Sequence, residues 1–162
     1  MTTPLTLQPG DIVLVHGAGP ISVSIEAITR SMFSHVALVA DAASKQLIEA
    51  QWGRTVGYQP LDYYAGHTII TRVPNLTLTQ RAGIVEYAHS KFGTPYDYFA
   101  LVAEFERYVF HRPLTPEEHG RLICSSLVAD AYRSIGVMLS DERIASPGDI
   151  WDSPLPTIVG RY

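Results

Sequence analysis

Short apolar runs separated by turn residues dominate the first half of the chain, and this pattern predicts strands. The run at 12–15 is rich in β-branched residues and follows a turn signal, so we expect a buried strand there. Two further runs, at 34–39 and 45–50, are joined by a segment of hairpin length. Another run, at 68–73, ends at a proline.

The second half has the end signals and the periodicity of helices. Thr77 and Gln80 fit a capping box, in which each side chain binds the other residue's backbone N–H, and the helix they open should run to about Lys91. Another helix is predicted over 124–135. Its core ridge consists of Ile123, Leu127, Ala131 and Ile135. Shorter helices are expected at 22–31, at 99–110 and after a second capping box at 115–118, and the tail from 146 to 162 should be mostly irregular.

Strands come first and helices follow, which predicts an α+β fold with helices packed on an antiparallel sheet. The chain has 162 residues, the length of one ordinary domain, so we expect a single domain over 1–162. Hydrophobic residues make up 46% of the sequence and charged residues 17%. This composition supplies enough apolar side chains for a core and too little charge for a disordered chain.

Charge and segment length exclude two classes of partner. Twelve Lys and Arg residues against sixteen Asp and Glu give a formal charge of −4, whereas binding to nucleic acid needs a basic surface. No apolar run is long enough to cross a bilayer, so no integral membrane association is expected. The first residues lack the basic start and apolar stretch of a signal peptide. We therefore expect a cytoplasmic protein, unless a phage or a secretion system delivers it elsewhere.

The single cysteine, Cys124, is a candidate nucleophile. One thiol cannot form an internal disulfide or a zinc site built from several cysteines. Cys124 stands near the start of a predicted helix, where the dipole stabilises a thiolate and free backbone N–H groups stabilise an oxyanion. The alternative is a small hydrophobic residue buried in the core.

The predicted hairpin supplies a base for such a thiol. If its turn is centred on Ala42, residues whose numbers add to 84 face each other, and His35 then lies opposite Glu49. Opposed side chains are about 4.5–5.5 Å apart at Cβ, which suits a carboxylate that accepts an imidazole N–H. The other ring nitrogen stays free to take a thiol proton. A register slip of one residue would break this pairing, and a structural histidine is the alternative.

Six short segments occur in order along the chain: Gly10-Asp11-Ile12-Val13, Ser34-His35-Val36-Ala37-Leu38-Val39, Leu47-Ile48-Glu49-Ala50, Gly93-Thr94-Pro95-Tyr96-Asp97, Cys124-Ser125-Ser126-Leu127-Val128 and Ser146-Pro147-Gly148-Asp149-Ile150. Together they resemble the YiiX-like (YaeF/YiiX) branch of the NlpC/P60 superfamily of papain-like cysteine hydrolases. In that branch the fold is circularly permuted, so the histidine precedes the cysteine. The resemblance implies that Cys124 is the nucleophile, His35 the base and Glu49 the orienting group.

Five further residues are candidate substrate contacts. Tyr96 and Asp97 lie near the cleft by resemblance, with a capped turn and a packed tyrosine as the alternative. His16 follows the first strand and could instead be a solvated loop histidine. Trp52 could line the cleft or simply pack against other side chains. Ser125, which follows the cysteine, is the fifth candidate. The other histidines have no metal-ligand spacing, so we expect neither a catalytic metal nor a cofactor.

The leading hypothesis is a cysteine hydrolase of the amidase or peptidase type that cleaves an acyl bond, an amide, through a thioester acyl-enzyme. Its substrate would be a peptide, a peptidoglycan-derived peptide or an acylated small molecule. A second hypothesis keeps the same residues in a lipid acyltransferase or thioesterase of the lecithin:retinol acyltransferase type. A third is a non-catalytic binding module on the same fold.

Overall fold

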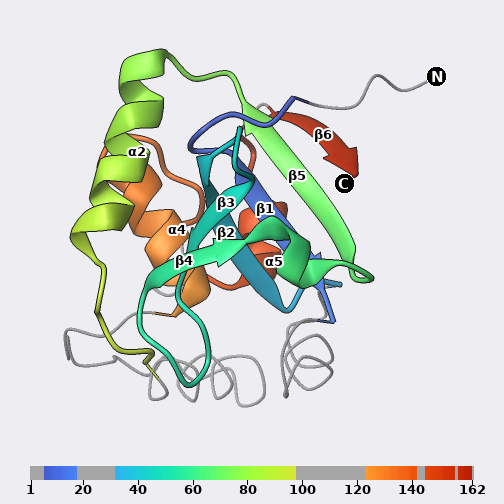
Figure 1. Cartoon of the computed structure of the whole chain (residues 1–162). Helices are drawn as coiled ribbons and strands as arrows, with labels where there is room; N and C mark the ends of the chain where they lie inside the picture. Colours follow the sequence, from blue (N-terminus) through green and yellow to red (C-terminus); the bar gives the residue numbers. More distant parts are fainter. Residues whose placement is uncertain (1–5, 18–31, 98–122, 142–144, 156, 162) are drawn as a thin grey trace.

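The computed structural model describes residues 6–17, 32–97, 123–141, 145–155 and 157–161 (Figure 1). Within these residues, six strands form one sheet in the order β4-β3-β2-β1-β5-β6, and every neighbouring pair is antiparallel. The strands are β1 (Ile12–His16), β2 (His35–Asp41), β3 (Gln46–Glu49), β4 (Gly57–Pro60), β5 (Thr68–Pro74) and β6 (Thr157–Arg161).

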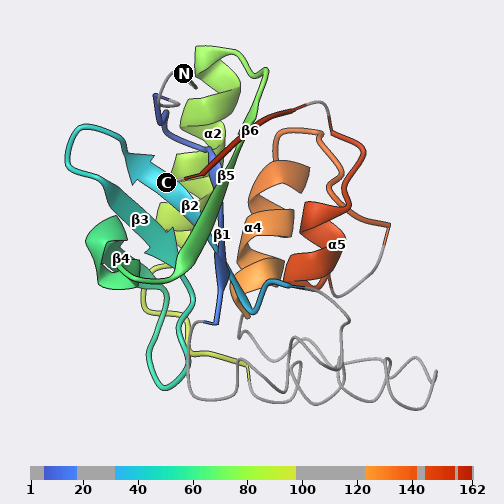
Figure 2. The ribbon, with the colours of Figure 1, turned by 90° about the vertical axis from the view of Figure 1, so that its right-hand side faces the viewer.

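Helices cover one face of this sheet. They are α2 (Leu78–Ser90), α4 (Cys124–Arg133) and the short α5 (Pro147–Trp151). Figure 2 shows α4 beside the sheet with α5 next to it. A 3₁₀-helix, η1 (Leu61–Tyr64), lies between β4 and β5 in the chain. The expected α+β fold, with helices packed on an antiparallel sheet, is confirmed.

The core has two layers because the central strands are buried on both faces. On β1, Ile12 and Leu14 pack in the cluster that contains the helices, whereas Val13 and Val15 pack in the cluster that contains η1. Successive side chains of a strand point to opposite faces, so a strand buried on both sides needs a continuous apolar run. The uninterrupted run at 12–15 is the sequence signal of this position.

Local end signals predicted the two longer helices well. The Thr77 side chain accepts a hydrogen bond from the Gln80 N–H, and the Gln80 side chain binds the Thr77 N–H, so the predicted capping box is present. The second predicted helix begins at Cys124 and its last helical residue is Arg133. The helices expected at 22–31, at 99–110 and after 115–118 lie outside the described residues.

The tail is more ordered than its three prolines indicated. Ser146 and Asp149 form a capping box that opens α5, and residues 157–161 form β6 beside β5. A Pro at the first helical position favours a helix start, so Pro147 was a signal for a helix there. The expectation of a mostly irregular tail was therefore wrong.

The hairpin register also differs from the prediction. Leu38 pairs with Ile48 and Val39 with Leu47, so paired numbers add to 86 and not to 84. The turn occupies 42–45, and a bulge between Val39 and Asp41 adds one residue to β2. A bulge of this kind changes the register without a signal in the hydrophobic pattern. The prediction that His35 lies directly opposite Glu49 was wrong.

Two buried arginines tie distant segments to the sheet. Arg81 of α2 pairs with Asp11 at 2.6 Å and donates to the carbonyl oxygens of Pro9 and Pro74. Arg72 of β5 donates to four carbonyl oxygens in and just after α5, which belong to Ile150, Trp151, Ser153 and Leu155.

No helix in the described part of the chain is long and apolar enough to span a membrane.

Candidate active site

Cys124 is the first residue of α4, and its side chain is buried, with 6% of its surface exposed. The preceding residue, Ile123, is the N-cap and has no side chain that could bind the free N–H groups of the first turn. A helix start carries a partial positive charge and unpaired N–H donors. These groups can stabilise a thiolate, and they can stabilise the oxyanion that forms when a thiolate attacks a carbonyl.

His35 and Glu49 are hydrogen-bonded even though they are not directly opposed. His35 Nε2 donates to Glu49 Oε2 at 2.9 Å. Continuing the observed register by one residue places Glu49 across from Ala37, so His35 and Glu49 are diagonal neighbours. Diagonal positions share a face and are about 7–8 Å apart, a gap that two long side chains can bridge. The predicted contact therefore exists through a different register.

A tyrosine completes the surroundings of the carboxylate. Tyr64 of η1 donates from its hydroxyl to Glu49 Oε2 at 2.7 Å, and its ring lies 5.5 Å from the His35 ring. Gln51 in turn donates from Nε2 to the Tyr64 hydroxyl oxygen at 3.4 Å. Glu49 is 2% exposed, and no described group bonds its other oxygen, Oε1. Both donors therefore hold the same carboxylate oxygen.

The electrostatics of the site favour a charged imidazole. Burial disfavours the imidazolium of His35, but the negative charges of Glu49 and Cys124 and the hydrogen bonds to both raise its pKa from 6.5 to about 10. Because Nε2 is held by Glu49, Nδ1 is the ring nitrogen left for the sulfur. Burial and the charge of Glu49 raise the pKa of Tyr64 well above its ordinary value, so the phenol stays protonated as a donor.

The comparisons with known proteins show the family of the chain. Residues 6–153 match a family described as "Permuted papain-like amidase enzyme, YaeF/YiiX, C92 family". The chain belongs to this family. It is therefore a papain-like hydrolase of the amidase type, and the resemblance seen in the sequence is confirmed.

A solved structure has the same fold. The crystal structure described as metalloprotein YiiX from Escherichia coli O157:H7 matches with a TM-score of 0.73 and 21% sequence identity. The match covers 95% of this chain and 97% of that chain. A search of curated proteins found no match.

The candidate substrate contacts of this amidase-family chain differ in how far they are exposed to solvent. Tyr96 and Asp97 are buried, with exposed fractions of 7% and 5%, and Tyr96 belongs to the core cluster that contains Cys124. Trp52 is 43% exposed, and its ring lies 5.8 Å from the Tyr96 ring. His16 is exposed, and its Nδ1 contacts the Met32 carbonyl oxygen.

Ser125 is fully buried beside the cysteine, and its hydroxyl has no described hydrogen-bond partner. A fully buried side chain cannot contact substrate in this conformation. The roles of the five candidate contacts stay predictions.

Tyr64 and Gln51 were not predicted from the sequence. Tyr64 follows a short strand that the pattern did not reveal, and Gln51 lies two residues beyond the predicted orienting group. An isolated tyrosine or glutamine in a polar segment carries no signal of its own. The only usable hint was that a buried carboxylate needs donors.

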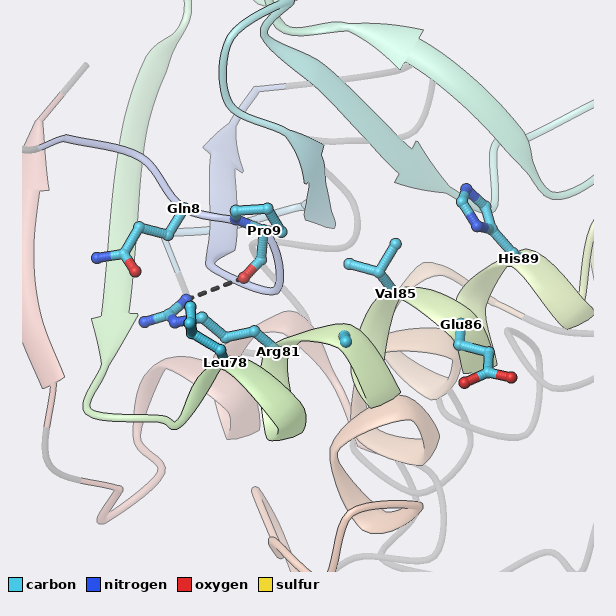
Figure 3. Close-up of a pocket in the computed structure, with 8 residues that line it drawn as sticks. Gln8, Pro9, Leu78, Arg81, Val85, Glu86 and His89 are labelled. Carbon is cyan, nitrogen blue, oxygen red and sulfur yellow. Dashed lines mark hydrogen bonds between the residues drawn. The ribbon is translucent and has the colours of Figure 1, made fainter.

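A separate hollow of about 540 Å³ lies between α2 and the segment that precedes β1, and the residues above do not line it. In Figure 3, Arg81 reaches the Pro9 carbonyl oxygen, and His89 lies farther along the helix. The hollow is lined by Gln8, Pro9, Leu78, Arg81, Ala82, Val85, Glu86 and His89. None of the predicted catalytic or substrate-binding residues belongs to it.

Proposed function

We propose that this amidase-family chain hydrolyses an amide bond of a peptide or related substrate, with Cys124 as nucleophile, His35 as proton carrier and Glu49 as orienting group. The observation that carries the proposal is the 2.9 Å hydrogen bond from His35 Nε2 to Glu49. That bond fixes the ring and leaves Nδ1 for the sulfur. A thiol with a fixed base at a helix start is an activated nucleophile.

In the proposed reaction, the Cys124 thiolate attacks the carbonyl carbon, and the N–H groups at the start of α4 stabilise the resulting oxyanion. The C–N bond then breaks, and the His35 imidazolium gives its proton to the leaving amine. This leaves a thioester between substrate and sulfur. Water, deprotonated by neutral His35, attacks the thioester, releases the carboxylic acid and restores the thiolate with the imidazolium.

Glu49 and Tyr64 act in this scheme without touching substrate. Glu49 holds the ring orientation and stabilises the imidazolium that exists in the resting enzyme. Tyr64 donates to the same carboxylate oxygen, which helps to keep a buried charge solvated by hydrogen bonds. Tyr64 is therefore a positioning residue.

The solved structure of YiiX is described as that of a metalloprotein, whereas the residues of this chain do not suit a metal ion. Within the described residues, no group of three or more His, Cys, Asp or Glu side chains is placed to hold one. The side chains at the candidate site also bond one another, since His35 and Tyr64 both donate to Glu49 Oε2. These residues do not fit a metal centre, and the proposed steps use side chains alone.

Trapping the thioester tests the proposal, and the single cysteine makes the result easy to assign. The protein is mixed with p-nitrophenyl acetate, the reaction is quenched in acid, and the mass of the intact protein is measured by mass spectrometry. We expect one acetyl adduct that hydroxylamine removes. The adduct should be absent in Cys124→Ala and form much more slowly in His35→Ala. His89→Ala is the matched control, because His89 is exposed on α2 and should leave acylation unchanged.

Two outcomes would contradict the proposal. If the native protein forms no adduct while the unfolded protein does, the chain is a binding module in which Cys124 is simply buried. If the adduct forms but is discharged only by added amines or lipids and not by water, the enzyme is an acyltransferase.

A further inference from the structure

The turn that follows β3 is held rigidly by the segment that follows α2. Within the turn, the Arg54 N–H donates to the Gln51 carbonyl oxygen at 3.1 Å. Three backbone bonds then join this loop to the other segment: Tyr96 N–H to Arg54 O at 3.2 Å, Val56 N–H to Thr94 O at 2.9 Å and Gly93 N–H to Val56 O at 3.0 Å. Thr55 and Pro95 form a β-bridge at the same place. The turn is thus a fixed platform.

This platform adjoins the candidate active site. Its first residue, Gln51, donates to the Tyr64 hydroxyl, which bonds Glu49. Tyr96, to which the turn is bonded, packs in the same core cluster as Cys124. In both views the loop after β3 lies at the end of the molecule at which α4 begins (Figure 1, Figure 2).

Two exposed side chains of the turn have the chemistry of a recognition site. The Trp52 ring lies against Tyr96 and still has 43% of its surface exposed, so it offers an apolar face at a fixed position. Arg54 is exposed, and its guanidinium has no hydrogen bond or ion pair with any described residue. Other described arginines are engaged: Arg81 pairs with Asp11, Arg133 with Asp130, and Arg72 binds carbonyl oxygens.

A guanidinium with no partner among the described residues is unusual in a chain whose formal charge is −4. Guanidinium groups bind carboxylates through two parallel hydrogen bonds, and a tryptophan face packs on apolar atoms. We propose that the turn from Gln51 to Arg54 selects an acidic substrate, with Arg54 pairing with a carboxylate near the scissile amide and Trp52 covering the apolar atoms between them. This inference rests on the proposed function, because it places Cys124 at the reacting bond.

Alkylation of Cys124 by two reagents of similar size tests the charge selection without a known substrate. N-iodoacetyl-glutamate and N-iodoacetyl-glutamine differ by one negative charge, and both react at the single thiol. The ratio of their rates, acidic over neutral, is measured at pH 7 and low ionic strength. We expect Arg54→Gln to lower this ratio about two- to fivefold, the effect of removing one unit charge from a partly solvated site. Arg54→Glu should lower it further.

Controls separate charge recognition from general effects. Arg133→Gln removes an exposed arginine at the far end of α4 and should leave the ratio unchanged. High salt should bring the wild-type ratio close to that of Arg54→Gln. Trp52→Ala should slow both reagents by the same factor, because it removes apolar contact and no charge.

The outcomes distinguish this inference from the proposed function. If Arg54→Gln leaves the ratio unchanged while His35→Ala still slows both reagents, the acidic-substrate inference is wrong and the catalytic site stands. If His35→Ala has no effect on either rate, the proposed function fails first. If Trp52→Ala changes neither rate, the tryptophan has no part in recognition.

Discussion

Replacing Glu49 by glutamine is the most direct test of the electrostatics of the site. The change keeps the shape of the side chain and removes its charge. The pKa of His35 is raised from 6.5 to about 10, with Glu49 the largest of the influences that raise it. That difference corresponds to roughly 5 kcal/mol in favour of the imidazolium. In Glu49→Gln, burial still disfavours the charged ring and only Cys124 still favours it, so we expect the pKa of His35 to fall towards its ordinary value.

The rate of Cys124 alkylation by iodoacetamide reports this change as a function of pH. The pKa of an isolated thiol is about 8.5, so only about 1% of it is thiolate at pH 6.5. In the wild type, the imidazolium of His35 should favour the reactive thiolate by charge attraction and make alkylation at pH 6.5 faster than that of an isolated thiol. In Glu49→Gln, the ring loses the carboxylate that favours its charge, so the rate at pH 6.5 should be about 10- to 100-fold lower.

The free energy of unfolding should also depend on pH through His35, and the direction of that dependence is defined. Because the pKa of His35 is raised on folding, its contribution to the free energy of unfolding is complete below pH 6.5 and is lost as pH rises towards 10. Urea unfolding of the wild type should therefore show this loss, and that of Glu49→Gln should show much less of it. Glu86→Gln, an exposed position on α2, is the matched control. Identical alkylation profiles for the wild type and Glu49→Gln would refute the reasoning.

Three further substitutions test single contacts. Tyr64→Phe removes a donor to a buried carboxylate and should cost about 2 kcal/mol of the free energy of unfolding in urea. It should also lower the rate of Cys124 alkylation at pH 6.5, because Glu49 loses a donor that stabilises its charge, whereas a purely structural role for Tyr64 would leave that rate unchanged. Asp11→Ala leaves Arg81 buried without its partner and should cost about 3–5 kcal/mol in the same assay. Thr77→Ala removes one side of the capping box and should cost about 1 kcal/mol, with alkylation unchanged.

Elements with local signals were predicted from the sequence, and elements held by distant partners were not. The apolar run at 12–15 and the capping box at Thr77 act within a few residues, and both gave the correct element. Strand β4 has the sequence Gly-Tyr-Gln-Pro, which is a poor strand sequence in isolation. It forms at the edge of the sheet because β3 offers a free side, and edge strands tolerate proline. Strand β6 likewise depends on β5.

The three residues proposed for catalysis were selected from the sequence because two separate lines of reasoning pointed to them. Helix-start reasoning and family resemblance both selected Cys124, and the hairpin and the resemblance both selected His35 and Glu49. Neither line of reasoning selected Tyr64. It reaches Glu49 only because η1 follows β4 along the same face of the sheet, and β4 itself was not visible in the pattern.

The hairpin error shows why the central contact was predicted despite a wrong register. The difference between sums of 84 and 86 moves each partner by two residues, and side chains repeat their face every two residues. Glu49 therefore stays on the face of His35 and shifts from a direct to a diagonal position. A slip of one residue would have turned the carboxylate towards the helices, away from Tyr64. Family resemblance alone could not tell these cases apart, whereas the bulge beside Asp41 sets the final register. The contact depends on the parity of the register more than on its exact value.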